Sequence, residues 1–246
     1  MNIRPPVSKQ ELMERAERLA GITIQQLANK MGLKVPETMT HAKGWFGNVL
    51  EHSLGADASS SPKPDFVNLG IELKSIPIEK NGKPKESTYI CVAQLDPSAL
   101  SSWENSLVKC KLTEVLWIPV EASKTIPVSS RRIGSPVLWK PDTNQERQLK
   151  EDWQELCDMI ALGEIDKISA SMGKYLQIRP KAANASILTK DKNKTGTNNL
   201  TLPRGFYLRS SFTRLIISSK NQIELFNEQI QNEPPIEYCT DDGPYR

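Results

Sequence analysis

The apolar run from Val115 to Val120 is the segment that most constrains how this chain can fold. It is far shorter than the roughly 20 residues that a membrane-spanning helix needs. It therefore predicts a buried strand, ended by Pro119 and Pro127 nearby. A chain of 246 residues has room for one large domain, or for two modest lobes that share a core.

Amphipathic segments predict several helices. The first follows Ser8 and Glu11, which have capping-box spacing, and Gly21 stops it. The clearest pattern follows Thr143 and Glu146, which have the same spacing. Further helices are expected at Ile24–Met31, about Trp45–Leu54 and Phe212–Ile217.

Short strands are predicted by period-two patterns and turn residues. Gly70–Ile76 reads as a strand, Asn81-Gly82 is a strong turn signal, and Ser87–Ala93 is rich in strand-favouring residues, so these segments predict a hairpin or meander. Met172–Arg179 and Gly205–Arg209 are expected to be two more strands, separated by a basic loop.

Cysteine and histidine usage argues against a zinc site. The four cysteines are widely spaced, with no CxxC, and the chain has two histidines. We expect free thiols in a reducing compartment and, because residues Met1–Gln10 lack an apolar signal segment, a cytoplasmic protein with no membrane partner. Any metal would be held by oxygen ligands, which favours magnesium, manganese or calcium.

Charge is distributed unevenly, although the net charge is only +3. Between Ser171 and Arg214 there are nine basic residues and one acid, whereas six acids and one arginine follow from Asn221 onward. The basic segment indicates a surface for a polyanion, or alternatively a solvated face. Residues 221–246 are expected to be an acidic, mobile tail.

Asp65, Glu72 and Lys74 form the candidate catalytic group. In a strand, Glu72 and Lys74 share one face, roughly 7 Å apart at Cα, while Leu73 points to the opposite face and into the core. Two carboxylates and the Leu73 carbonyl are suitable ligands for Mg²⁺, with Mn²⁺ as a substitute, and a divalent cation polarises a phosphoryl oxygen and activates water. Lys74 would orient the water, accept its proton or stabilise negative charge. The sequence pattern fits all three roles equally.

The motif alone is weak, but longer segments resemble the MutH family, the strand-nicking endonucleases of methyl-directed mismatch repair, in the restriction-endonuclease-like PD-(D/E)xK superfamily. The resemblance covers roughly Ser8–Ser218 in order. Its clearest segments are Lys43-Gly44-Trp45-Phe46-Gly47, Asp65-Phe66, Gly70-Ile71-Glu72-Leu73-Lys74, Val115–Glu121, Arg147–Trp153, Gln177–Asn184 and Leu202–Leu208.

The resemblance implies an α/β fold: a restriction-endonuclease-like mixed sheet flanked by helices, with two lobes around a DNA-binding cleft. We expect one endonuclease domain over residues 1–220, with an N-terminal lobe to about 110 that holds the catalytic residues and a C-terminal lobe over about 111–220 that reads DNA. The implied reaction is Mg²⁺-dependent nicking of the unmethylated strand at hemimethylated or unmethylated GATC sites in duplex DNA. The implied partners are a MutL-type ATPase activator and, through it, a MutS-type mismatch binder, and the chain is expected to act as a monomer.

The same resemblance adds site residues. Glu51 and Lys111 match an acid and a second lysine near the active centre, and Arg179-Pro180-Lys181 and Tyr207 match segments that read DNA. Tyr207 has the size to reject an N6-methyl group in the major groove, and Lys181 can donate to guanine; a core tyrosine and a solvated lysine are the structural alternatives. Lys43, Arg204 and Arg209 are interpreted equally well as phosphate contacts or as surface charges. Two other functions stay open: a restriction endonuclease making double-strand breaks, and a DNA-binding module without catalysis.

Overall fold

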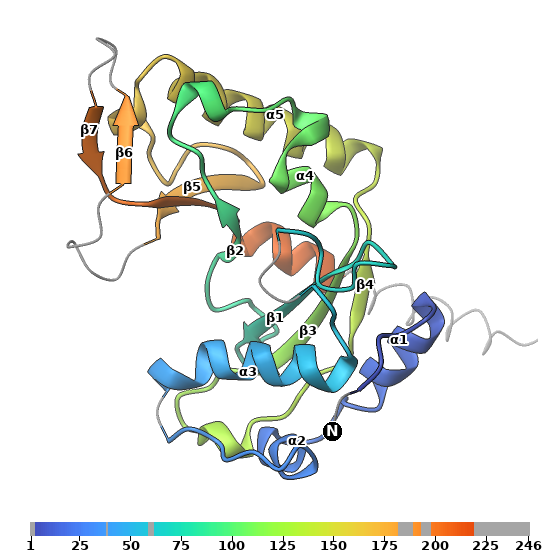
Figure 1. Ribbon diagram of the computed structural model, residues 1–246. Helices are drawn as coiled ribbons and strands as arrows, with labels where there is room; N and C mark the ends of the chain where they lie inside the picture. Colours follow the sequence, from blue (N-terminus) through green and yellow to red (C-terminus); the bar gives the residue numbers. More distant parts are fainter. Residues whose placement is uncertain (1–2, 38, 59–61, 182–188, 193–197, 219–246) are drawn as a thin grey trace, which may run out of the picture.

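A three-stranded sheet lies between two groups of helices in the computed structural model, which describes residues 3–37, 39–58, 62–181, 189–192 and 198–218 (Figure 1). The sheet has the order β1-β3-β4, formed by Glu72–Ile78, Val115–Glu121 and Val137–Trp139. β1 runs parallel to β3, and β4 runs antiparallel to it. The predicted buried strand is confirmed as the central one, with residues 115–120 all buried. Pro119 lies inside β3 rather than ending it, and β4 pairs with β3 only as far as Trp117.

The two faces of this sheet pack into two hydrophobic cores. Leu73, Leu116 and Ile118 belong to the core that contains α1 (Lys9–Glu17), α2 (Ile24–Lys30) and α3 (Met39–Leu54). Ile76, Val115 and Trp117 belong to the core that contains α4 (Leu107–Leu112) and α5 (Thr143–Ala161). Side chains alternate between the faces because a strand has a period of two residues. Each core takes residues from both sides of residue 110. The division of the chain into two lobes at about that residue stays a prediction.

The N-terminal helices begin at capping residues. Ser8 accepts the N–H of Glu11, as predicted, and Thr23 forms a reciprocal capping box with Gln26 at the start of α2. α3 starts earlier than the predicted Trp45 and ends before Gly55. Gly55 has a φ of 82°, and a Cβ there would lie 2.5 Å from the carbonyl oxygen of Arg4, so the helix end requires glycine.

The predicted hairpin or meander after β1 forms only next to its turn, where Ile78 and Pro84 make one antiparallel bridge. The turn at Asn81-Gly82 forms, with the Gly82 N–H donating to the Glu79 carbonyl at 2.9 Å, but the following strand leaves the sheet. Pro77 and Pro84 lack the N–H groups that a longer ladder would need. Instead β2 (Thr88–Val92) enters a second, antiparallel sheet of order β2-β8-β5, together with β8 (Arg204–Leu208) and β5 (Leu176–Pro180).

The long helix α5 begins one residue from its predicted capping pair. Asp142, not Thr143, caps it, and the partner is Gln145 rather than Glu146. Its buried face includes Trp153, Leu156 and Ile160, which confirms the amphipathic helix predicted after Thr143. The remaining elements are η1 (Pro97–Ala99), η2 (Trp103–Asn105), η3 (Val128–Ser130), η4 (Ile165–Lys167), the hairpin β6 (Thr189–Lys192) and β7 (Asn198–Thr201), and a helix over 210–218.

Among the described helices, none combines the length and the apolar character needed to cross a bilayer. The predicted acidic tail, residues 221–246, lies outside the described residues.

Candidate active site

The candidate catalytic group lies at the start of β1, on the edge of the central sheet. Glu72 is only 2% exposed, and its N–H donates to the Glu114 carbonyl beside the first residue of β3 at 3.0 Å. Lys74 lies on the same face and donates to Glu72 Oε1, while Leu73 packs into the opposite core. This alternation is the one that the sequence predicts.

Two ammonium groups hold the Glu72 carboxylate. Lys74 Nζ lies 2.5 Å from Oε1, and Lys111 Nζ lies 3.0 Å from Oε1 and 2.8 Å from Oε2. Lys111 also donates to the carbonyl oxygen of Lys63, in the loop before Asp65, at 3.3 Å. Lys111 comes from the last turn of α4, which leads directly into β3, and the parallel pairing of β3 with β1 brings it beside Glu72.

Asp65 joins the group through the backbone of β1. Its Oδ2 accepts the N–H of Leu73 at 2.8 Å. This N–H can reach the Asp65 loop because β1 is an edge strand, in which alternate N–H groups point away from β3. Burial, followed by the charge of Glu72, raises the pKa of Asp65.

Glu51, on α3, adds a third carboxylate. Its pKa is raised by burial first and then by the charge of Asp65, with Glu72 contributing to the same effect. The carboxylates therefore lie close enough to disfavour one another's ionisation, and Lys74 and Lys111 only partly offset this repulsion.

This donor set fits a hard divalent cation. Carboxylate oxygens are the ligands that Mg²⁺ and Mn²⁺ prefer, and a cation among them would relieve the mutual repulsion of Asp65, Glu72 and Glu51. In the described part of the chain, no cluster of three or more His, Cys, Asp or Glu side chains is arranged to hold a metal by itself. Two carboxylates with water and a phosphate completing the shell is the arrangement that these residues suit.

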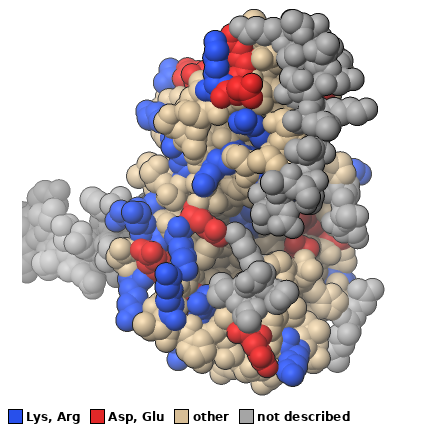
Figure 2. Space-filling model, turned by 90° about the vertical axis from the view of Figure 1, so that its left-hand side faces the viewer, with Lys and Arg blue, Asp and Glu red and all other residues tan. Residues whose placement is uncertain are grey.

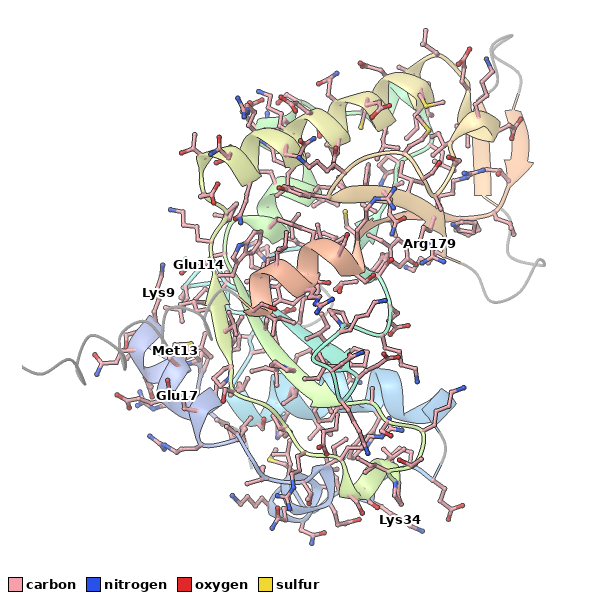
Figure 3. All side chains as sticks on the ribbon, turned by 180° about the vertical axis from the view of Figure 1, so that it is seen from behind. Lys9, Met13, Glu17, Lys34, Glu114 and Arg179 are labelled. Atoms are coloured by element: carbon pink, nitrogen blue, oxygen red, sulfur yellow. The ribbon has the colours of Figure 1, made fainter. Side chains whose placement is uncertain are left out.

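A cleft of about 810 Å³ lies between Lys74 and the second sheet, and Asp65 and Glu72 are not among the described residues that line it. One wall includes Glu51 and Lys74, and the other includes Arg179, Pro180 and Tyr207. Figure 2 faces this side of the molecule and shows many Lys and Arg side chains with Asp and Glu interspersed. Figure 3 labels Arg179 on the opposite side of the molecule from Lys9 and Glu114.

The other residues predicted to contact DNA are placed differently. The guanidinium of Arg209 donates to the backbone carbonyls of Gly173, Ala170 and Met172, each at 2.8 Å. Arg204 Nη1 lies 3.4 Å from the Ile168 carbonyl, and neither arginine is among the described residues that line the cleft. Lys43 lies in α3, but its side chain is outside the described part of the chain.

Most of the residues that line the cleft were not predicted from the sequence, and Ser87, Tyr89 and Arg131 are three of them. Ser87 Oγ accepts from Gln177 Nε2 at 2.7 Å and lies 3.4 Å from Arg179 Nη1, and Tyr89 and Arg131 also line the cleft. No local motif marks these residues. Ser87 and Tyr89 reach the cleft only because β2 pairs with β8.

Comparison with known proteins matches the chain to one family. The family model described as "MutH: DNA mismatch repair enzyme MutH" matches residues 54–152. The chain is 48% identical over 222 residues to the DNA mismatch repair protein MutH of Shigella flexneri, covering 90% of this chain and 97% of the relative. It is 49% identical over 216 residues to the protein of the same name from Escherichia coli (strain K12), covering 88% and 94%.

These matches confirm the predicted family and enzyme class, and the mixed α/β architecture agrees with the restriction-endonuclease-like fold that was expected. The chain belongs to the MutH family of DNA mismatch repair endonucleases.

Proposed function

We propose that this endonuclease nicks the unmethylated strand at hemimethylated or unmethylated GATC sites during mismatch repair. The observation that carries the proposal is the cleft that has Glu51 and Lys74 on one wall and Arg179, Pro180 and Tyr207 on the other. A duplex lying in this cleft would present its backbone to Glu51 and Lys74 while its base edges face the second sheet.

Asp65 and Glu72 would hold Mg²⁺, or Mn²⁺ in its place, with the Leu73 carbonyl as a further ligand. The cation supplies charge stabilisation at the phosphoryl oxygen and a lower pKa for bound water. The Leu73 N–H fixes the Asp65 carboxylate against β1, and Lys111 orients Glu72 through both of its oxygens. Glu51 adds negative charge beside the group, which strengthens its attraction for a cation.

Lys74 would act on the reacting phosphate. It is the lysine that both contacts Glu72 and lines the cleft, so its ammonium can donate to a phosphate oxygen or to the attacking water. Of the roles that the sequence leaves open, this position favours orientation of water and stabilisation of negative charge.

Arg179, Pro180, Lys181 and Tyr207 would read the DNA. Tyr207 is half-buried at the cleft wall, and the bulk of its ring there would reject an N6-methyl group on adenine. Lys181 is exposed at the end of β5, where its ammonium can donate to guanine acceptors. Arg204 and Arg209 are assigned to the protein scaffold, because their guanidinium groups donate to backbone carbonyls.

We further propose that the protein acts in the cytoplasm as a monomer, and that a MutL-type ATPase, recruited by a MutS-type mismatch binder, activates it. This proposal rests on family membership. The test is a nicking assay in which a MutL-type partner is added to the purified chain. An unchanged rate with the partner present would contradict it.

The test of the reaction uses plasmids carrying one GATC site in fully methylated, hemimethylated or unmethylated form, with Mg²⁺ or with EDTA. Open circles from the latter two forms, only with Mg²⁺, are expected, and Asp65→Ala should abolish them while thermal unfolding stays cooperative. Linear product would favour the restriction-endonuclease alternative. Binding without cleavage, indifferent to chelator, would favour a binding module.

A further inference from the structure

Tyr89 is part of the wall of the cleft that faces DNA in the proposed function. It lies on β2, opposite Tyr207 of β8 in the strand register, and is half-buried at the cleft surface. Neither the metal site nor the hydrophobic cores account for an aromatic ring at this position.

The ring of Tyr89 contacts two of the residues proposed to read the DNA sequence. The ring of Tyr207 meets it edge-on, with centroids 5.3 Å apart and an interplanar angle of 66°. The ammonium of Lys181 lies over its face, 4.8 Å from the centroid. An edge-to-face aromatic pair and a cation–π contact are both attractive, and here they share a single ring.

The backbone around Tyr89 is shaped to admit this ring. The register of β2 against β8 shifts between Tyr89 and Cys91, and such a bulge re-aims the neighbouring side chain. Across from it, Gly205 leaves the space that the ring occupies. A Cβ on Gly205 would lie 2.8 Å from Tyr89 Cε2 and 3.0 Å from the Cys91 carbonyl oxygen. Any larger residue at 205 would push the ring out of place.

We infer that Tyr89 is a positioning residue for GATC recognition, whose ring holds the Lys181 ammonium and the Tyr207 ring in fixed relative positions before DNA enters. The inference rests on the proposed function, because it takes Lys181 and Tyr207 as the reading residues. Lysine has a long and mobile side chain, so restricting it in the free protein lowers the entropy that binding must remove.

The test compares Tyr89→Leu with Tyr89→Phe. Each variant is assayed, with the wild type, for kcat/KM on duplexes carrying GATC and on duplexes with one base pair of the site changed. Loss of the ring is expected to lower the ratio of the two values about threefold to tenfold, the order that these contacts carry. Tyr89→Phe, which keeps the ring, is expected to rescue the ratio. Gly205→Ala, which displaces the ring, should lower it as Tyr89→Leu does.

Lys181→Ala and the double variant with Tyr89→Leu show whether Tyr89 acts through Lys181 or independently of it. If Tyr89 acts through Lys181, the double variant loses less discrimination than the sum of the two single variants. An unchanged ratio in Tyr89→Leu would overturn the inference, including the case in which kcat/KM falls equally on both duplexes. If Lys181→Ala discriminates less while Tyr89→Leu is unaffected, the proposed function stands and the inference alone fails. An unchanged ratio in Lys181→Ala removes the reading role of Lys181, and with it the inference.

Discussion

Replacing Asp152 should destabilise the protein strongly, although the residue lies outside the active site. Asp152 is 3% exposed on α5, and its carboxylate accepts four hydrogen bonds. Oδ1 accepts from Gln148 Nε2 and the Lys174 N–H, at 3.0 and 2.9 Å. Oδ2 accepts from the N–H groups of Tyr175 and Leu176, at 2.6 and 2.8 Å. These bonds hold the loop that leads into β5.

The expected loss in the free energy of unfolding follows from the number of N–H donors that each substitution leaves without an acceptor. Asp152→Ala leaves three backbone N–H groups without their acceptor, at about 1–3 kcal/mol each, and the two partly hydrated ones fall at the low end. We expect the free energy of unfolding to fall by about 4 kcal/mol. Asp152→Asn keeps one acceptor oxygen and turns an amide N–H₂ toward the other two donors, so a loss of about 2–3 kcal/mol is expected.

Urea denaturation followed by tryptophan fluorescence measures both values. Asp158→Ala is the matched control, because Asp158 lies on the same helix and is exposed, and it should change the free energy of unfolding by less than about 0.5 kcal/mol. A loss below about 1 kcal/mol in Asp152→Ala, with an unchanged m-value, would refute the assignment of this carboxylate as the anchor of the loop.

The other predictions concern the metal site and two arginines, Arg209 of the scaffold and Arg179 of the cleft. The raised pKa of Asp65, caused by burial and by Glu72, means that its ionised form destabilises the folded state at any pH above that raised value. In chelator, Asp65→Asn should therefore be more stable than the wild type at about pH 8, and the gain should vanish below the unfolded pKa of about 4, where both states are protonated; a gain that grows on acidification contradicts this. Mg²⁺ should raise the Tm of the wild type but not that of Glu72→Ala, and equal shifts would remove Glu72 from the metal site. Arg209→Met should lower stability by about 2–3 kcal/mol, by loss of its hydrogen bonds to carbonyls, and leave the salt dependence of DNA binding unchanged. Arg179→Met should reduce the salt slope by about one, and the reverse pattern would return Arg209 to the DNA contacts.

Features that depend on neighbouring residues were predictable from the sequence. The helix starting at Ser8 and the central strand at Val115 follow from short patterns of capping and apolar residues, and the structure confirms both. The shared face of Glu72 and Lys74 follows from the period of a single strand. Family membership was also predictable, because the segments that resemble the family follow one another in order along the chain.

Features that depend on long-range pairing were not predictable from local patterns. The segment Ser87–Ala93 favours a strand, but nothing in it indicates that its partner is β8 rather than β1. Arg209 carries the same charge as Arg179, yet its guanidinium binds backbone carbonyls while Arg179 lines the cleft. The residue type alone gives no sign of this difference.

The sequence by itself determined the family, the buried strand at Val115–Val120 and the acid–lysine pair on one face of β1. Only the tertiary structure decided that Lys111 meets Glu72, that the Leu73 N–H holds Asp65, and that Tyr89 lies under Lys181. The physical reason is that helix and strand periods act over a few residues, where side-chain direction follows from backbone geometry. Contacts between distant segments depend instead on which strands pair and which faces are buried, and the whole chain settles these together.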